Sequence, residues 1–165
     1  MNSFSQSIIE RWNEKVSRND TVYVVGGLFY KHKDPDNVLK QLNGKKRLVV
    51  GNHDGGWLKR LDASRYFLSV DHLAEISDGK HKLVLCHYPL MCWKHELKSY
   101  MIHGHIHNNT NQPYWPVIKN NPRLLNAGAD INGFEPVSFD EMLANNECFK
   151  ADTGAVLYNI KEAQK

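Results

Sequence analysis

The chain has few cysteines, and their arrangement excludes two classes of small stabilised fold. Cys86, Cys92 and Cys148 are odd in number and show no CxxC spacing, which argues against a disulfide framework and against a zinc knuckle. Cys86 lies in an apolar run, so we interpret it as a small buried hydrophobic residue in preference to a catalytic thiol. The fold must therefore depend on a hydrophobic core.

Long hydrophobic runs are also absent. A membrane helix needs about 20 consecutive apolar residues, and neither such a run nor a signal-peptide core after Met1 is present. We therefore predict a cytoplasmic protein that does not contact a membrane. No repeat, low-complexity tract or Pro/Gly/Ser-rich linker divides the sequence, which predicts a single domain over residues 1–165.

An excess of charge of one sign is absent too, because the net charge is only +3. The densest basic run is Lys45-Lys46-Arg47, between a predicted helix and a predicted strand. These side chains could meet a phosphate backbone or could form a solvated connection. Nucleic acid is therefore an open possibility as a partner, but the composition does not require one.

Three predicted strands end in polar residues that could act together. The three motifs are Gly51-Asn52-His53-Asp54 after residues 48–50, His87 after residues 82–86, and His103-Gly104-His105-Ile106-His107 after residues 99–102. Ligands of open α/β sheets bind at the carboxyl ends of strands, so we expect these ends to converge. Each motif alone is typical of an ordinary turn, but three such ends favour a site.

The residue types in these motifs suit metal and proton chemistry. Amide oxygens and imidazoles are ligands that zinc, manganese and iron accept. His53 can transfer protons near neutral pH, and Asp54 could orient its imidazole. We expect the alternate histidines His103, His105 and His107 to point to one side of an extended backbone.

In order and spacing, GNHD at 51–54, His87 and the GHxH motif at 104–107 resemble calcineurin-like metallophosphoesterases, particularly small bacterial and phage-type members. The similarity extends from residues 8–16 to segments 125–130 and 136–141, which is most of the chain. It implies an α/β fold in which two packed sheets are flanked by helices in α-β-β-α layers. It also implies hydrolysis of a phosphomonoester or phosphodiester by metal-activated water.

The resemblance assigns roles to individual residues. It makes Asn52, His87 and His105 ligands of one divalent ion, which could be manganese, zinc or iron, and it makes His107 a ligand of another. His53 would stabilise or protonate the leaving oxygen, with Asp54 holding it in place. The resemblance does not identify the residues that bind the rest of the phosphate-ester substrate.

Two carboxylate motifs of the family are missing from this chain. No DxH strand precedes Thr21, and Gly27 stands where the family has the Asp that bridges both metals. The remaining neutral donors predict one ion instead of two, and impaired activity in a degenerate active site. The alternative hypothesis is a non-catalytic relative that binds one metal or a phosphate-bearing ligand, or a truncated inactive product.

Other residues could replace the missing carboxylates only if they reached the site from loops. We considered His32, Asp34 and Asp130 for this role and expect none of them to fill it. His32 lies among lysines as a solvated side chain, and Asp34 precedes Pro35, where it is suited to cap a helix.

The missing DxH motif also predicts a missing strand. Ser7-Ile8-Ile9-Glu10 has the form of a capping box, so a helix near residues 7–17 begins almost at once and Met1 would lie inside the usual domain. A sheet without its first strand exposes unpaired N–H and C=O groups. We therefore predict an N-terminally incomplete domain that is marginally stable or self-associates through an exposed sheet edge.

The remaining elements follow from the hydrophobic pattern. It predicts further helices near residues 35–42 and 138–145, with Gly44 ending the first of these. It predicts strands near residues 21–26, 47–50, 66–76, 82–86, 99–103, 123–127 and 155–160. Tyr114-Trp115-Pro116 would form either a substrate wall or a hydrophobic plug.

Overall fold

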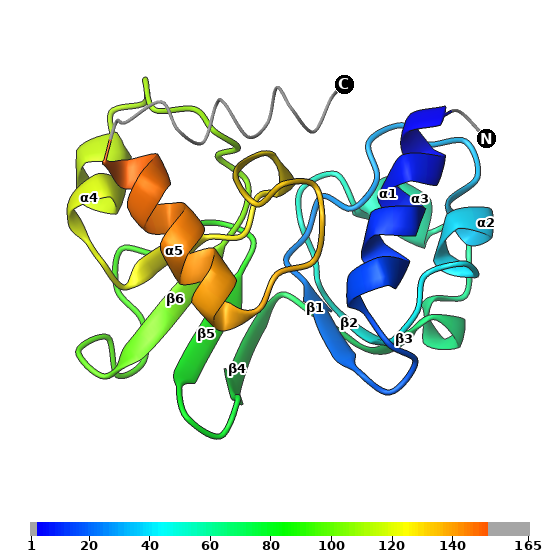
Figure 1. The fold of residues 1–165 in the computed structure, drawn as a ribbon, viewed down its shortest axis with the longest axis horizontal. Helices are drawn as coiled ribbons and strands as arrows, with labels where there is room; N and C mark the ends of the chain where they lie inside the picture. Colours follow the sequence, from blue (N-terminus) through cyan, green and yellow to red (C-terminus); the bar gives the residue numbers. More distant parts are fainter. Residues whose placement is uncertain (1–2, 152–165) are drawn as a thin grey trace.

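The computed structural model describes residues 3–151, in which helices cover two β-sheets (Figure 1). The helices are α1 (Ser3–Lys15), α2 (Pro35–Leu39), α3 (Gly55–Leu58), α4 (Trp115–Asn120) and α5 (Phe139–Lys150). The strands are β1 (Thr21–Val24), β2 (Lys45–Val49), β3 (Phe67–Asp71), β4 (Leu73–Ser77), β5 (Lys82–Cys86), β6 (Ser99–His103) and β7 (Leu124–Asn126). This order confirms the predicted α/β class. The strand predicted at 155–160 lies outside the described residues.

The strands divide into a parallel sheet and a mixed sheet. The first has the order β1-β2-β3 and is parallel, whereas in the second, β4-β5-β6-β7, only β4 runs antiparallel to its neighbour. The single strand predicted for residues 66–76 is wrong, because the chain passes from one sheet to the other at His72. The crossing lets Phe67 pack against the helices while Ile76 faces the space between the sheets.

Three apolar layers hold the sheets and helices together. On β2, Leu48 packs with Trp12 of α1 and other helix residues, and the next residue, Val49, packs with Leu85 of the opposite sheet. Successive side chains of a strand point to opposite faces, so one strand serves both layers. A third layer joins the second sheet to α4 and α5, where Trp115 packs against Phe149. The predicted α-β-β-α layering is therefore confirmed.

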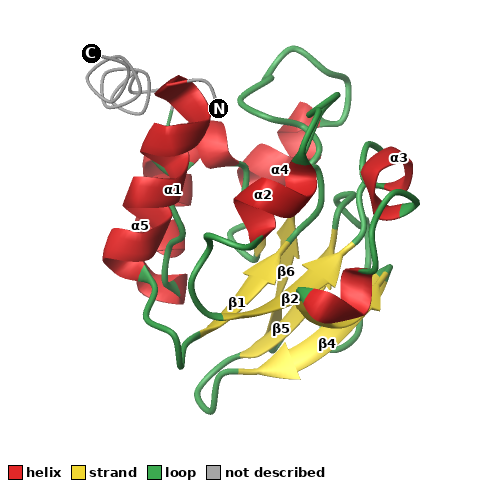
Figure 2. Ribbon diagram, turned by 90° about the vertical axis from the view of Figure 1, so that its right-hand side faces the viewer, coloured by secondary structure: helices red, strands yellow, loops and turns green. Residues whose placement is uncertain are grey.

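Helix α1 covers the first sheet and α5 the second, and both lie on the same side of the strands (Figure 2). Contacts between them link the two sheets. The Nζ of Lys15, at the end of α1, lies 2.9 Å from Glu141 in the first turn of α5 and 3.1 Å from Glu135. Arg11 of α1 also donates to the carbonyl of Gly133 at 3.0 Å. These contacts fix the segment between β7 and α5 against the first helix.

Several helix boundaries differ from the sequence prediction. Helix α1 begins at Ser3, so Ser7 and Glu10 lie inside it and do not form a capping box. A capping box does occur at the start of α5, between Ser138 and Glu141, and that helix continues to Lys150 instead of residue 145.

Around the second helix, one local prediction is confirmed and another is wrong. The carboxylate of Asp34 accepts from the amide of Asn37 at 3.2 Å, which confirms the predicted N-cap of α2. That helix already ends at Leu39, so Gly44 is not its terminator. Gly44 has φ +87° and turns the chain into β2.

The aromatic segment 114–116 enters α4, and its Trp115 is the hydrophobic plug, one of the two predicted alternatives. Trp115 is buried in the layer beneath α5, with its ring centroid 5.0 Å from that of Phe149. Tyr114, which precedes the helix, is 42% exposed. The sequence pattern did not predict a helix here, although Pro116 suits a first turn.

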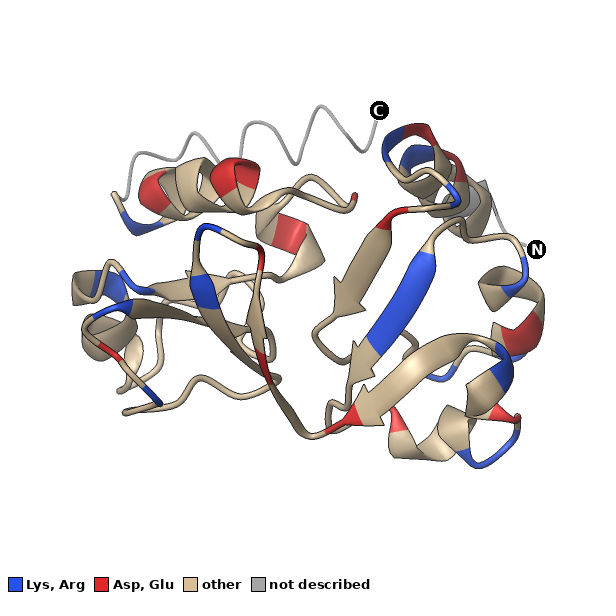
Figure 3. Ribbon diagram, turned by 90° about the horizontal axis from the view of Figure 1, so that it is seen from below, with Lys and Arg blue, Asp and Glu red and all other residues tan. Residues whose placement is uncertain are grey.

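The basic run at residues 45–47 belongs to β2, where it forms a continuous basic stretch on the strand (Figure 3). Lys46 is only 6% exposed, and its Nζ donates to the carbonyls of Leu42 and Gly44 at 2.8 and 2.9 Å. Burial lowers the pKa of this ammonium group. The run is therefore part of a strand and not a solvated connection. The ammonium group of Lys46 is used in hydrogen bonds to the backbone.

The edge of the first sheet and the lengths of the helices bear on the predictions of an exposed sheet edge and of no membrane helix. Among residues 3–151, β1 pairs with β2 alone, so β1 forms an edge of the first sheet. No helix in this part of the chain has the length and apolar character needed to cross a membrane.

Candidate metal centre

The loops that follow β1, β2, β5 and β6 meet at the carboxyl ends of these strands. Asn52 and His87, from the second and third of these loops, approach within 2.8 Å between Oδ1 and Nε2. The ring of His105 lies 5.2 Å from that of His87 between centroids. Burial lowers the pKa of His105, and charges on His87, His107 and His53 lower it further. Thus the strand ends predicted from the sequence do converge.

His87 lies in a cradle made of glycine backbone. The imidazole is 4% exposed, and its Nδ1 lies 2.9 Å from the carbonyl oxygen of Val25. A Cβ added at Gly26 would lie 2.4 Å from the ring, one at Gly51 would lie 2.8 Å away, and one at Gly104 would lie 3.4 Å away. These glycines, from three different loops, therefore leave the room that the imidazole occupies.

The hydrogen bonds of His87 determine what its other nitrogen can do. A carbonyl only accepts, so Nδ1 carries the hydrogen toward Val25, and Nε2 of the neutral ring has a lone pair. The Nδ2 of Asn52 lies 3.1 Å from Nε2 of His53 and donates there, which turns Oδ1 toward His87. With this tautomer the 2.8 Å contact needs a proton on Nε2, a turned Asn52 amide, or a cation beside both atoms.

This pair of acceptors fits a divalent cation. Ring nitrogens that bind metals have their second N–H held by a carbonyl or carboxylate, as Val25 holds His87. In the state without a cation, turning the Asn52 amide over would let Nδ2 donate to His87 and satisfy both histidines. The same side chains can therefore exist with and without an ion.

Asp54 does not hold His53, which corrects the sequence prediction. Its side chain is 0% exposed, and its oxygens accept four hydrogen bonds, from the amides of Gly27, Leu28 and Gly51 and from the indole of Trp57. All four acceptor sites of the carboxylate are thereby used. Asp54 instead joins the loop after β1 to the loop after β2.

His53 lies exposed at the rim of the group. Its Nε2 contacts Asn52, and its ring packs edge-on against Tyr30 with 4.8 Å between centroids. A second exposed tyrosine, Tyr88, packs against His105 at 4.6 Å. Two tyrosine rings therefore flank the histidines.

The three alternate histidines do not share a side, contrary to prediction. His103 ends β6 and is completely buried, and burial lowers its pKa to about 4. His105 and His107 have φ values of +67° and +52°, so the backbone there is left-handed and not extended. The left-handed turns place these two rings on the surface and leave His103 in the interior.

Asp130 lies beside His107, one of the residues to which the resemblance assigns a ligand role. Its Oδ2 lies 3.5 Å from Nδ1 of His107 and accepts from the amide of Asn108 at 2.9 Å. By contrast, His32 packs on Phe29, away from these motifs. The signal that could have identified Asp130 is the pairing of β6 with β7, since residues after adjacent parallel strands lie near each other.

Position 27 has room for a Cβ, but its left-handed backbone would be strained by any side chain. Gly27 has φ +68°, and a Cβ there would meet His87 at 3.6 Å, an ordinary contact distance. Position 27 therefore faces the imidazole. Within residues 3–151, no three His, Cys, Asp or Glu side chains are arranged to hold a metal ion. Any ion at this place depends on the amide oxygen of Asn52 as well as on imidazoles.

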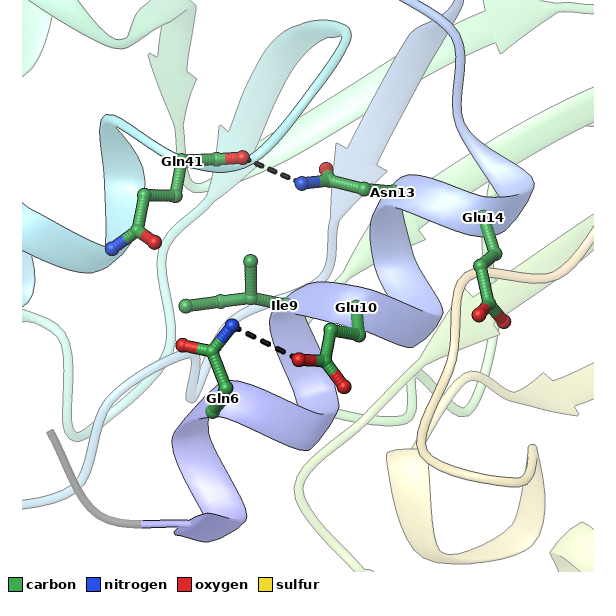
Figure 4. Close-up of a pocket in the computed structure, with 6 residues that line it drawn as sticks. All are labelled: Gln6, Ile9, Glu10, Asn13, Glu14 and Gln41. Carbon is green, nitrogen blue, oxygen red and sulfur yellow. Dashed lines mark hydrogen bonds between the residues drawn. The ribbon is translucent and has the colours of Figure 1, made fainter.

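A surface depression elsewhere on the molecule offers no comparable chemistry (Figure 4). It lies along α1, and its polar groups are hydrogen-bonded close by: Gln6 donates to Glu10 at 3.1 Å and Asn13 to the carbonyl of Gln41 at 2.8 Å. The histidine motifs do not line it.

Comparison with known proteins supports the fold and names no activity. No family model matches the sequence. The chain is 28% identical over 139 residues to the Uncharacterized protein MJ1445 of Methanocaldococcus jannaschii, covering 82% of this chain and 71% of that protein. It is 25% identical over 150 residues to the Gene 66 protein of Mycobacterium phage D29, covering 74% and 73%.

A solved structure shares the fold. The protein of unknown function AQ665 from Aquifex aeolicus superposes with a TM-score of 0.64 at 23% sequence identity. The match covers 86% of this chain and 84% of that one. The fold is therefore shared with that protein.

Proposed function

We propose that this protein is a metal-dependent phosphoesterase, a hydrolase whose reduced centre holds one divalent ion through Asn52, His87 and His105. The observation that carries the proposal is the convergence of Asn52 Oδ1 and His87 Nε2, 2.8 Å apart, on a buried imidazole that Val25 holds at Nδ1. The resemblance of the three motifs to calcineurin-like metallophosphoesterases supplies the reaction class.

In the proposed hydrolysis, a bound ion would activate water and the side chains would hold the ion and donate a proton. A bound divalent ion lowers the pKa of water and offsets the charge of a phosphate group. His87 is buried and held by Val25, so its donor atom keeps a fixed position. His53 is exposed beside Asn52 and is free of Asp54, so it can donate a proton to a leaving alkoxide.

The donor set also predicts that the activity is weak. Asn52, His87 and His105 are neutral ligands, and Gly27 contributes no carboxylate to offset the charge of the ion. This feature favours the second candidate function, a non-catalytic relative that binds one metal. The two functions share the same ion site and differ only in turnover.

Metal content and hydrolysis, measured on the same samples, separate these functions. The protein is equilibrated with Mn²⁺ or Zn²⁺, dialysed, and assayed by mass spectrometry for bound metal and with bis(p-nitrophenyl) phosphate and p-nitrophenyl phosphate for turnover. His105→Ala should lose the metal. His95→Ala is the matched control, because His95 is also exposed and also has a positive φ, +56°.

Each result has a defined meaning. Bound metal with turnover that His105→Ala and His53→Ala reduce supports the phosphoesterase. Bound metal without turnover supports the non-catalytic relative. A wild-type protein that binds neither ion overturns both.

A further inference from the structure

A continuous row of contacts links an exposed tyrosine to the buried imidazole of the candidate centre. The ring of Tyr30 packs against His53 with 4.8 Å between centroids, and Nε2 of His53 lies 3.1 Å from Nδ2 of Asn52. The Oδ1 of Asn52 lies 2.8 Å from Nε2 of His87. Each step of this row is a direct contact, so only the ring of His53 separates Tyr30 from Asn52.

A second exposed tyrosine lies at the other end of the row. Tyr88 follows His87 directly in the chain, and its ring contacts those of His87 and His105 with 5.2 and 4.6 Å between centroids. These are the two imidazoles of the proposed ion site. Tyr88 therefore touches both of them, whereas Tyr30 lies on the side where His53 would release a proton.

The fold makes little use of these two tyrosines. Tyr30 is 65% exposed and Tyr88 is 45% exposed, and neither belongs to the three apolar layers. Within residues 3–151, the side-chain contacts of both are ring contacts. Single exposed aromatic rings are normal on protein surfaces, but two that flank one group of polar side chains are typical of a binding site.

The charge beside Tyr30 suits an anionic ligand. The ammonium group of Lys31 lies 5.2 Å from the centroid of the Tyr30 ring. Lys31 has φ +49°, a left-handed conformation that is uncommon for a residue with a Cβ and that occurs preferentially at active sites and ligand clamps. A positive charge and an exposed ring therefore lie together at this end of the row.

We propose that Tyr30 and Tyr88 are substrate-binding residues that select a phosphodiester with flat aromatic groups, with one ring at each tyrosine and the phosphate at the histidines. This inference rests on the proposed function and deepens it. A diester has an organic group on each side of phosphorus, and the row has a tyrosine at each end, so a monoester would use only one of them. An aryl group and a nucleobase share the flat ring that stacks on tyrosine.

Calorimetric titration of the protein in Mn²⁺ buffer with three diesters tests the proposal, and it does not depend on turnover. Stacking of two rings should make diphenyl phosphate bind about 10–100-fold more tightly than dimethyl phosphate. Dicyclohexyl phosphate is similar in size but not flat, so it should lose most of this gain. Equal binding of the diphenyl and dicyclohexyl esters would show simple apolar burial and would overturn the proposal.

Substitutions locate the effect at the two rings. Tyr30→Leu and Tyr88→Leu should each weaken the Kd for diphenyl phosphate by about 3–10-fold and leave the Kd for dimethyl phosphate within about twofold. Tyr30→Phe and Tyr88→Phe keep the ring and should bind like the wild type. Tyr114→Leu is the matched control, because Tyr114 is 42% exposed and, in the described part of the chain, has no ring contact with a histidine.

The outcomes separate this inference from the proposed function. Equal Kd values for diphenyl phosphate in the wild type and in both leucine variants overturn the inference alone. A wild-type protein that binds neither Mn²⁺ nor any of the diesters overturns the proposed function as well. A dinucleoside phosphate whose binding is weakened by the same leucine variants assigns the rings to nucleobases, and one that does not bind assigns them to aryl groups.

Discussion

The clearest quantitative prediction concerns Asp54, which the structure makes a clamp between two loops. In Asp54→Asn one side-chain oxygen becomes an NH₂ group of nearly the same size. The remaining oxygen can keep two of the four hydrogen bonds, but the NH₂ then faces two N–H donors from the set Gly27, Leu28, Gly51 and Trp57. In either orientation one of these two donors has a buried bond (Gly51 or Trp57) and the other a partly buried one (Gly27 or Leu28).

The expected cost follows from these contacts. Each buried donor left without an acceptor destabilises a fold by about 1–3 kcal/mol, so Asp54→Asn should reduce the free energy of unfolding by about 2–6 kcal/mol. In a domain of this size, 1 kcal/mol corresponds to a change in Tm of about 2–4 °C. We therefore expect Tm to fall by roughly 10 °C.

Differential scanning calorimetry and urea unfolding measure this loss, with Asp140→Asn and His53→Ala as controls that should melt like the wild type. Asp140 is an exposed carboxylate and His53 an exposed ring, so neither change removes a buried contact. The reasoning is refuted if Asp54→Asn melts within about 2 °C of the wild type but loses activity as His53→Ala does. Such a result would return Asp54 to the role of orienting His53.

Three further predictions follow. Gly27→Asp should tighten Mn²⁺ binding by roughly tenfold, because position 27 faces His87 and a carboxylate there lies beside the ion; equal metal content in both proteins would show that this position does not act on the centre. The pKa of His103 is lowered to about 4 in the fold. Because the unfolded chain takes up that proton first, stability should fall by about 3 kcal/mol as the pH drops from about 6.5 to 4. Urea titrations should show this loss in the wild type and a flatter profile in His103→Leu. Sedimentation at rising concentration should reveal self-association through the β1 edge, and a monomer that melts above about 65 °C would contradict it.

The sequence was most informative where local pattern decides the structure. Apolar β-branched runs predicted the strands before Asn52, His87 and His105, and the turn at each strand end followed from the polar residues. Because β5 and β6 are parallel neighbours, the convergence of His87 and His105 could be anticipated, whereas the approach of Asn52 depends on how the two sheets pack. The predicted α-β-β-α layers came instead from the family resemblance of the three motifs, and not from local pattern.

The errors come from contacts between distant segments and from backbone handedness. Asp54 has partners near residue 27 that no local spacing reveals. The alternation of His103, His105 and His107 suggested a common side, but two left-handed residues reverse that expectation. Asp130 was set aside because its position beside His107 depends on the pairing of β6 with β7.

The most direct test of the central claim is anomalous diffraction from a crystal of the protein grown with Zn²⁺ or Mn²⁺. The account predicts one peak within about 2.0–2.3 Å of both Asn52 Oδ1 and His87 Nε2, with His105 in the same coordination shell. It predicts that the peak disappears in His105→Ala and persists in His95→Ala. A crystal without a peak at Asn52 and His87, or with one only at a surface pair such as Asp78 and His81, would contradict it.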